Sequence, residues 1–323
     1  MKKNQLQPEF QQIQQAYERI KGIIHRTPVL TCTSINQMVQ ANLFFKCENF
    51  QKTGSFKFRG ASNTVFSLSE KEASRGVVTH SSGNHAAALS LSAKMKGIPA
   101  YIVMPSSAPN IKVEAVKGYR GIITFCEPTL KSREETAQKI IDQKHAHLVH
   151  PYNNYKIIAG QGTAALELME EVDDLDIILA PVGGGGLLSG TAVTAKSNNK
   201  SIKVIGCEPE NADDAYRSKK AGYIIPSENP DTIADGLLTS LGTKTFPVIR
   251  DLVDDIVLVS EHEIVKAMHL LYERMKIVIE PSSAVVLGAL IAEKVKIRNK
   301  KVGLVVSGGN IDISGISSVI NLK

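Results

Sequence analysis

The stretch that decides the fold reads IILAPVGGGGLLSG and occupies residues 177–190. Its first six residues, 177–182, form an apolar run of strand length, and residues 187–197 have the composition of a helix. Between them stand four consecutive glycines, Gly183 to Gly186. Because glycine has no Cβ, their N–H groups can converge on one point at the positive end of the helix. The stretch therefore predicts a strand, a phosphate-binding loop and a helix.

Two other loop types compete for these glycines. A Walker loop needs Lys-Ser/Thr directly after the last glycine, and the chain has two leucines there. A dinucleotide-binding loop remains an alternative, because Gly184, Gly186 and Ser189 approximate G-x-G-x-x-G/A. Glu208 also ends the next predicted strand, where a ribose-binding acid belongs. This alternative predicts a nicotinamide-dependent oxidoreductase.

Apolar runs of strand length alternate with helix-period segments on both sides of this stretch. The alternation predicts βαβ units and parallel sheets, and so an α/β fold. We expect two domains, each with a twisted, mostly parallel sheet flanked by helices: a large domain of residues 1–76 and 152–323, and a small mobile domain of residues 77–151. Strands are expected at residues 43–47, 77–79, 101–104, 122–125, 177–182, 204–207 and 302–306. Helices are expected at residues 9–23, 57–67, 84–96, 109–117, 132–144, 157–172, 187–197, 262–275 and 283–295, with a short one after the last strand.

Composition and charge exclude several classes of protein. The 323 residues are 43% hydrophobic and 22% charged, which excludes a disordered chain. No apolar run reaches the ~18 residues of a membrane span, and no apolar segment follows the polar N-terminus as in a signal peptide. The 38 basic and 32 acidic residues give a net charge of +6 without a basic stripe, so we expect no nucleic-acid partner. The four cysteines form no C-x-x-C pair, and we expect reduced thiols in a cytoplasmic protein.

A second motif, KTGSFKFRG at residues 52–60, places Lys57 between two phenylalanines at the start of a predicted helix. A helix N-terminus and apolar neighbours both disfavour the charged ammonium form. A lysine biased toward the neutral amine is suited to Schiff-base chemistry, although a lysine in such a place can also be a solvated surface residue.

A third motif, HSSGNH at residues 80–85, joins a predicted strand to a predicted helix. Hydroxyls, a glycine and an asparagine at a helix N-terminus suit a carboxylate ligand, and a simple helix cap is the alternative. The turn SGGN at residues 307–310 follows the last predicted strand in the same way.

Together these motifs resemble those of the fold-type II pyridoxal-phosphate (PLP) enzymes, and within them the family of serine racemases and serine/threonine dehydratases. The resemblance runs from about Ile20 to about Ile311. It includes FFKCE at residues 44–48, IAGQGT at 158–163, TIADG at 232–236 and ERMK at 273–276. It implies a fold like that of the tryptophan synthase β subunit, PLP as cofactor, and L-serine, D-serine and L-threonine as small-molecule substrates.

The resemblance also implies roles for single residues. Lys57 would bind PLP as a Schiff base, Phe56 would stack on the pyridine ring, and Asn84 would hydrogen-bond its 3′-oxygen. Ser307 would meet the ring nitrogen. Because a neutral hydroxyl cannot keep that nitrogen protonated as an aspartate would, we expect a weaker electron sink, which suits elimination and racemisation. The phosphate would be held by Gly183, Gly184, Gly185 and Gly186, and the cofactor would be lined by Tyr152 and Gly236. The substrate would be bound by Ser81, Ser82, Gly83, Asn84, His85 and Arg133.

Ser82 bears on which reaction is catalysed. Racemisation needs an acid and a base on opposite faces of a planar carbanion. By resemblance, Lys57 supplies one face and Ser82 the other, whereas threonine dehydratases typically have alanine at this position. Some hydroxyaspartate dehydratases also have the serine. We therefore expect interconversion of L- and D-serine with elimination to pyruvate and ammonia, and keep a serine/threonine or threo-3-hydroxyaspartate dehydratase as the alternative.

The segment EPENADD at residues 208–214 is rich in the oxygen ligands that Mg²⁺ and Ca²⁺ prefer. By resemblance, Glu208, Asp214 and the carbonyl of Ala212 would bind Mg²⁺, Ca²⁺ or Mn²⁺ together with waters. A second group of metal-ligating side chains has spacings that fit no zinc motif, and we expect a surface helix end there instead. It consists of His145, His147 and His150.

The resemblance finally implies a homodimer that binds ATP as an activator at the subunit interface. The matching positions mostly keep a polar or basic character, which makes such a site compatible with this chain. They are Cys32, Thr33, Ser34, Lys52, Thr53, Lys112, Tyr119, Lys276 and Asn310.

Overall fold

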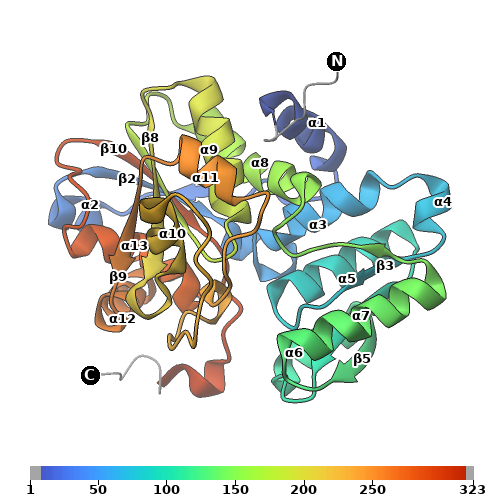
Figure 1. Cartoon of the computed structure of the whole chain (residues 1–323). Coiled ribbons are helices and arrows are strands. Elements are labelled where there is room, and N and C mark those ends of the chain that lie inside the picture. The colour runs from blue at the N-terminus through green and yellow to red at the C-terminus, as the bar shows by residue number, and fades with distance from the viewer. Residues whose placement is uncertain (1–8, 318–323) are drawn as a thin grey trace.

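The computed structural model describes residues 9–317 and contains two sheets flanked by helices (Figure 1). The pairings are parallel throughout, except for the antiparallel pair β1–β2 at one edge of the larger sheet. This confirms the predicted α/β class. The larger sheet has the order β1 (Val29–Leu30), β2 (Asn42–Cys47), β10 (Lys301–Val306), β7 (Ile177–Pro181), β8 (Lys203–Pro209) and β9 (Asp255–Val259). The smaller sheet has the order β5 (Ile122–Cys126), β4 (Ala100–Pro105), β3 (Val77–Thr79) and β6 (His147–Leu148).

Helices bury both faces of each sheet, as the continuous apolar runs in the parallel strands require. In the larger sheet, one face packs against α2 (Thr33–Val39), α12 (Glu261–Leu270) and α13 (Pro281–Ile291). The other face packs against α8 (Tyr155–Glu171), α9 (Gly186–Asn198), α10 (Asp214–Ala221) and α11 (Phe246–Leu252). In the smaller sheet, α5 (Asn84–Lys96) and α6 (Asn110–Gly118) cover one face and α7 (Leu130–Lys144) the other. The remaining helices are α1 (Phe10–Ile20), α3 (Lys57–Phe66) and α4 (Glu70–Ala73).

The predicted elements are present, with two changes at helix ends. The helix predicted over 262–275 is α-helical only to Leu270, and residues 271–275 form a π-helical turn that ends at Lys276 in the left-handed region, with φ of 60°. The helix predicted over 283–295 begins at Pro281, because proline suits the first helical position, and it ends at Ile291, four residues before the predicted end. The short helix expected after the last strand lies partly outside the described residues, which contain a 3-10 turn at Ile313–Gly315 followed by helical residues 316–317. The sequence prediction missed the strands β1, β6 and β9, whose patterns are short or half-exposed, and the short helices α2, α4, α10 and α11.

A buried ionic cluster fixes α3, the helix that begins at Lys57. The Arg59 guanidinium donates to Glu48 at 2.7 Å from two of its nitrogens, and also to Glu167 at 2.9 and 2.7 Å. The Lys46 ammonium lies 2.7 Å from Glu167, and the side chains of these four residues are fully buried. Buried charges need such pairing, because an unpaired one is strongly destabilising. The cluster therefore ties α3 to β2 and α8.

The carboxyl ends of both sheets supply the loops that matter for the site. In parallel sheets these ends lie on one edge, and ligands bind in the crevice outside them. The glycine loop follows β7, and Ser307 follows β10 in the larger sheet. The HSSGNH motif follows β3, and His150 to Tyr152 follow β6 in the smaller sheet.

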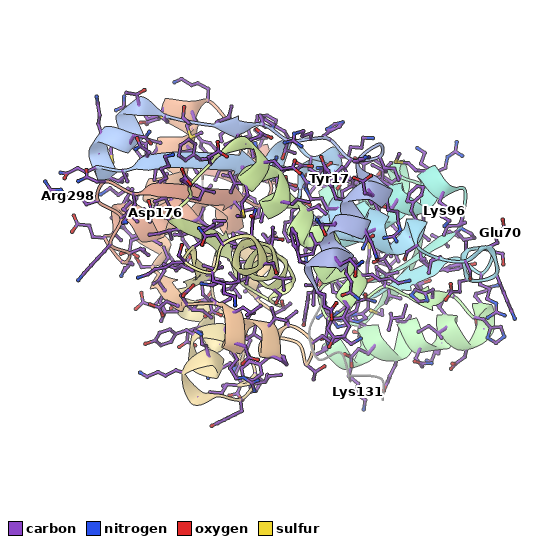
Figure 2. All side chains as sticks on the ribbon, turned by 90° about the horizontal axis from the view of Figure 1, so that it is seen from above. Tyr17, Glu70, Lys96, Lys131, Asp176 and Arg298 are labelled. Carbon is purple, nitrogen blue, oxygen red and sulfur yellow. The ribbon has the colours of Figure 1, made fainter. Side chains whose placement is uncertain are left out.

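Charge is spread over the periphery, as the sequence predicts. Figure 2 shows Glu70, Lys131 and Arg298 on different sides of the molecule. Across residues 9–317, no helix combines the length and the apolar character needed to cross a bilayer.

Candidate active site

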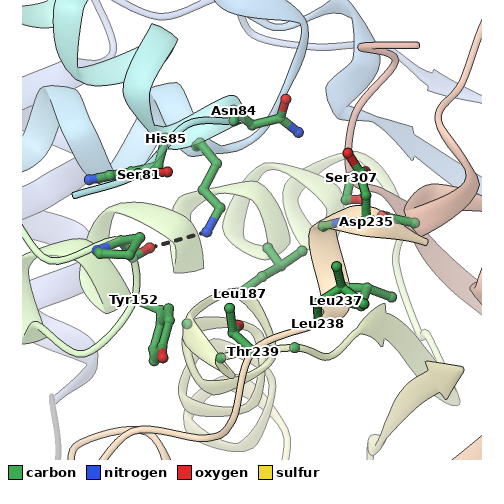
Figure 3. Close-up of a pocket in the computed structure, with 18 of the residues that line it drawn as sticks. Ser81, Asn84, His85, Tyr152, Leu187, Asp235, Leu237, Leu238, Thr239 and Ser307 are labelled. Carbon is green, nitrogen blue, oxygen red and sulfur yellow. Dashed lines mark hydrogen bonds between the residues drawn. The ribbon is translucent and has the colours of Figure 1, made fainter. Parts of the chain in front are cut away.

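A cavity of about 440 Å³ is lined by loops that follow the carboxyl ends of strands in both sheets (Figure 3). The structure brings together here every residue that the sequence predicts for catalysis, cofactor and substrate. They are Phe56, Lys57, Ser81, Ser82, Gly83, Asn84, His85, Arg133, Tyr152, Gly183, Gly184, Gly185, Gly186, Gly236 and Ser307.

Lys57 is the first residue of α3, and its Nζ donates to the carbonyl of Pro151 at 3.1 Å (Figure 3, dashed line). Burial lowers the pKa of this amine to about 8, although the charge of Glu280 acts in the opposite direction. At neutral pH the amine is therefore much closer to its nucleophilic form than an ordinary lysine. The predicted bias of Lys57 toward the neutral form is confirmed in direction, and its cause is burial.

The glycine loop presents free donors at the start of α9. Gly185 is the N-cap of this helix and has φ of 85°, a conformation that glycine adopts without strain. A Cβ at Gly184 would lie 2.3 Å from the Tyr152 ring, so the close packing of loop and ring requires glycine. Within residues 9–317, the N–H groups of Gly183, Gly184 and Gly185 have no hydrogen-bond acceptor. Unpaired donors at the positive end of a helix are suited to a phosphate.

The HSSGNH segment begins α5, and its N-cap is Gly83, which makes no side-chain cap hydrogen bond. Gly83 of this motif is therefore the helix cap, and Ser82 is not. Among the described residues, the Ser82 hydroxyl has no hydrogen-bond partner, and it lines the same cavity as Lys57. The first N–H groups of α5 also lie at this end of the helix, where they suit a carboxylate.

Sequence reasoning missed Glu280, a fully buried carboxyl group of the cavity wall. Asn84 Nδ2 donates to its two oxygens at 3.0 and 3.1 Å, and the Asn310 N–H donates to Oε2 at 3.1 Å. Asn310 Nδ2 in turn donates to Asn84 Oδ1 at 2.9 Å, which fixes the orientation of the Asn84 amide. Burial raises the pKa of Glu280 to about 7. The only sequence signal for Glu280 was its place before Pro281, at a helix start.

His150 corrects the prediction of a surface helix end, which is right only for the exposed His145 after α7. The chain turns inward at β6, so His147 lies on that strand and His150 reaches the cavity. The His150 ring contacts the Tyr152 ring edge-on, with centroids 4.6 Å apart, and its Nδ1 accepts from the Asn153 N–H at 3.0 Å. Burial lowers the pKa of His150 to about 4, so the ring is neutral.

Glu208 and Asp214 form a separate pair of buried carboxyl groups. Glu208 accepts from the N–H groups of Ala215 and Tyr216 at 2.8 Å each, at the start of α10. Both Asp214 oxygens are buried and make no close hydrogen bond among the described residues, although the Leu241 N–H and the Ser227 side chain lie near enough to lower the pKa of this carboxyl group. Burial raises the pKa of Glu208 to about 9 and that of Asp214 to about 7, and the charge of Asp214 adds to the effect on Glu208. Glu208 is thus buried against the N-terminus of α10 and does not line the cavity beside the glycine loop, which argues against the dinucleotide alternative.

A second cavity of about 650 Å³ adjoins the first. Four of the predicted nucleotide-binding residues line it, namely Thr53, Lys112, Tyr119 and Asn310. The other five, Cys32, Thr33, Ser34, Lys52 and Lys276, do not line it. Lys52 instead donates to the carbonyl of Ile23 at 2.5 Å.

A conserved-domain model described as pyridoxal-phosphate dependent enzyme matches residues 20–308, and the chain belongs to this family. Among its relatives, the serine racemase of Dictyostelium discoideum is 53% identical over 314 residues, which cover 96% of this chain and 97% of that protein. The structure of maize serine racemase has a TM-score of 0.94 at 47% identity and covers 96% of each chain. A beta-hydroxyaspartate dehydratase of Paracoccus denitrificans is 49% identical over 306 residues, covering 95% of this chain and 97% of that protein.

Proposed function

We propose that this chain interconverts L- and D-serine and also eliminates water from serine to give pyruvate and ammonia. The observation that carries the proposal is that the Ser82 hydroxyl, free of any partner within residues 9–317, shares one cavity with the Lys57 amine. The two groups come from different elements, since Lys57 begins α3 and Ser82 precedes α5. Racemisation needs two such proton-transfer groups, whereas elimination needs one.

The cavity fits PLP by the chemistry of its donors. Unpaired N–H groups of Gly183 to Gly185 suit the phosphate, and Lys57 is an amine with a lowered pKa. Asn84 would hold the 3′-oxygen, Phe56 would lie against the ring, and Ser307 would meet its nitrogen. When bound, PLP supplies an electron-withdrawing ring that acidifies the α-hydrogen of an amino acid.

The chain's own residues would then bind the substrate and move its proton. The N–H groups at the start of α5 would hold the substrate carboxylate, and the Ser81 hydroxyl lies at the same end of the helix. Lys57 Nζ would take the α-proton of L-serine, and the Ser82 hydroxyl would return one from the opposite side. A D-serine substrate would use the same two groups in reverse order.

The experiment is chiral product analysis with L-serine, measuring D-serine and pyruvate in the same reaction. D-serine together with pyruvate supports the proposal, whereas pyruvate alone would show a dehydratase.

A second candidate is a threo-3-hydroxyaspartate dehydratase. Arg133 lines the cavity, and its Nε is buried without a partner among the described residues. A guanidinium in that position suits a second carboxylate on the substrate. The Paracoccus denitrificans relative is named for this class of substrate. Comparing kcat/KM for L-serine and L-threo-3-hydroxyaspartate decides between the two candidates.

We also propose that residues 77–151 form a small domain that closes over the cavity. All strands of the smaller sheet lie within this segment. Lys112 on α6 pairs with Asp235 at 2.5 Å, and both residues line the cavity. Asp235 belongs to the segment after β8, so the pair would join the two proposed domains when the small domain closes.

For the metal, we propose that Glu208, Asp214 and the Ala212 carbonyl bind Mg²⁺, Ca²⁺ or Mn²⁺. The support is the pair of Asp214 oxygens that make no close hydrogen bond among the described residues, which a divalent cation would satisfy. In residues 9–317, no three His, Cys, Asp or Glu side chains gather as a metal site, so carbonyls and waters would complete the coordination.

We further propose a homodimer that binds ATP across its interface. Phe50 and Val278 are exposed apolar residues, and they lie near each other because Asn49 Nδ2 donates to the Val278 carbonyl. Four of the nine predicted nucleotide residues line one cavity of the single chain, so a partner subunit would have to bring the others into a shared site. Light scattering coupled to gel filtration, with and without ATP, tests both points.

A further inference from the structure

Thr245 contacts the glycine loop without lining the cavity that the loop faces. It is the N-cap of α11 and is fully buried, and its side chain makes no cap hydrogen bond to that helix. Its Oγ1 lies 2.8 Å from the Gly184 carbonyl oxygen, 2.9 Å from the Gly242 nitrogen and 3.2 Å from the Gly242 carbonyl oxygen. The Thr245 hydroxyl therefore serves the glycine loop and its own turn, and not the helix that it precedes.

The single proton of the Thr245 hydroxyl has one acceptor available to it. A backbone N–H can only donate, so Gly242 fills one lone pair of Oγ1. The Gly242 carbonyl already accepts from the N–H groups of Thr245 and Phe246, at 3.1 and 2.9 Å. Within residues 9–317, no other group donates to the Gly184 carbonyl, which is also the shorter contact. The Thr245 proton therefore points to the Gly184 oxygen.

This hydrogen bond fixes the peptide unit that joins Gly184 to Gly185. The unit is planar and trans, so its C=O and its N–H point in opposite directions. Because Thr245 holds the oxygen on the side away from the cavity, the Gly185 N–H points toward the cavity at the start of α9. Neither glycine has a Cβ, so the unit is otherwise free to rotate. The Thr245 hydroxyl is thus the group that keeps this donor in place.

We propose that Thr245 is a positioning residue that holds the Gly185 N–H toward the phosphate of PLP. The proposal rests on the proposed function, in which the glycine loop binds that phosphate. The turn that carries Thr245 is itself fixed from the other side. The Lys244 N–H donates to Asn153 Oδ1 at 2.7 Å, and Asn153 Nδ2 donates to Thr243 Oγ1 at 3.2 Å. The hydroxyl therefore holds the loop from a fixed point.

The test compares PLP with pyridoxal, which lacks the phosphate, as ligands of the full chain freed of cofactor. Equilibrium dialysis gives the Kd of each ligand. Thr245→Val keeps the shape of the side chain and removes the hydroxyl, so the Gly184–Gly185 peptide is released. We expect the Kd of PLP to rise about 10–100-fold, as for the loss of one hydrogen bond to a charged group, and the Kd of pyridoxal to stay unchanged. Thr245→Ser keeps the hydroxyl and should retain the wild-type Kd of PLP.

Thr191→Val is the matched control for replacing a buried threonine. Thr191 lies on α9, the helix that follows the glycine loop, and its hydroxyl has no hydrogen-bond partner in the described part of the chain. Both Kd values of this variant should equal those of the wild type. If Thr245→Val does not fold, Thr245→Ala tests the same point, because its smaller side chain cannot clash with the loop.

Two results would overturn the role of Thr245. A merely structural role would raise the Kd of PLP and of pyridoxal together, and an unimportant hydroxyl would raise neither. The wild type separates this failure from that of the proposed function. If the wild type binds PLP more tightly than pyridoxal and the Thr245 variants keep that preference, only the role of Thr245 is wrong. If the wild type shows no preference for PLP, the glycine loop does not hold the phosphate, and both proposals fail.

Discussion

Replacing Ser82 with alanine separates the two proposed activities. The substitution removes one of two proton-transfer groups, and the loss of one such group typically costs about 10²–10⁴-fold in rate. At about 1.4 kcal/mol per tenfold, this corresponds to about 3–5 kcal/mol of transition-state free energy for racemisation of L-serine. Elimination from L-serine uses the Lys57 side and should fall by less than about tenfold. Elimination from D-serine, whose α-proton would face residue 82 in the proposed mechanism, should be lost.

The structure also sets the expected effect on stability. A lost helix cap costs about 1 kcal/mol, but α5 is capped by Gly83 without any side-chain hydrogen bond. The free energy of unfolding of Ser82→Ala should therefore lie within about 0.5 kcal/mol of the wild type. Chiral chromatography, a coupled pyruvate assay and urea unfolding measure the three quantities. Ser81→Ala, which removes the neighbouring hydroxyl, should change both activities together. If Ser82→Ala lowers racemisation and L-serine elimination equally in a folded, PLP-loaded protein, the two-group mechanism is refuted.

Four further results are expected. Lys57→Ala should abolish both activities and the yellow colour of the bound cofactor, and a coloured, active variant would contradict the assignment of Lys57. In the cofactor-free protein, the rate at which acetic anhydride labels Lys57 should rise with pH, because only the neutral amine reacts. This rate should reach half its maximum near the pKa of about 8. A half-maximum near pH 10 would show a solvated lysine. Mg²⁺ at a hundredfold excess over its Kd should stabilise the protein by about 2.7 kcal/mol in a thermal-shift assay. The double variant Glu208→Ala, Asp214→Ala should lose this response. If a chelator leaves the melting temperature of the native protein unchanged, the site does not bind a metal. Glu167→Ala should lower the free energy of unfolding by about 3–5 kcal/mol, because it leaves Arg59 and Lys46 buried without their shared partner. The control Glu170→Ala removes a half-exposed pair with Arg26 and should cost under about 1 kcal/mol. Urea unfolding measures both.

The sequence predicted most of the fold because the buried parallel strands read as continuous apolar runs. β7 and β10 are of this kind, and each is followed by a glycine-rich turn that marks a loop. β1 and β6 were not predicted because each has only two residues, which is too few to show an alternating pattern. β9 has only two buried residues in five, so its pattern is weak.

The candidate site was predictable where its chemistry is local in the sequence. The glycine loop, Lys57 and the HSSGNH segment each carry their own motif, and the structure adds that they face one cavity. Glu280 and Thr245 carry none, because their partners Asn84 and Gly184 are distant in the chain and the contacts exist only after folding. His150 was misread for a similar reason, since the spacing of histidines does not show that the chain turns inward at β6.

The position of β10 has a consequence for how the protein is made. β10 is the last strand in the described part of the chain, yet it lies between β2 and β7 in the middle of the larger sheet. During synthesis, β2 and β7 therefore each keep one unpaired edge until residues 301–306 of β10 have been made. The smaller sheet uses one continuous segment and can fold well before that. Ser307 and its contact with Phe56 are also completed only at this late stage, so a nascent chain that has not yet passed residue 307 should lack part of the cofactor site.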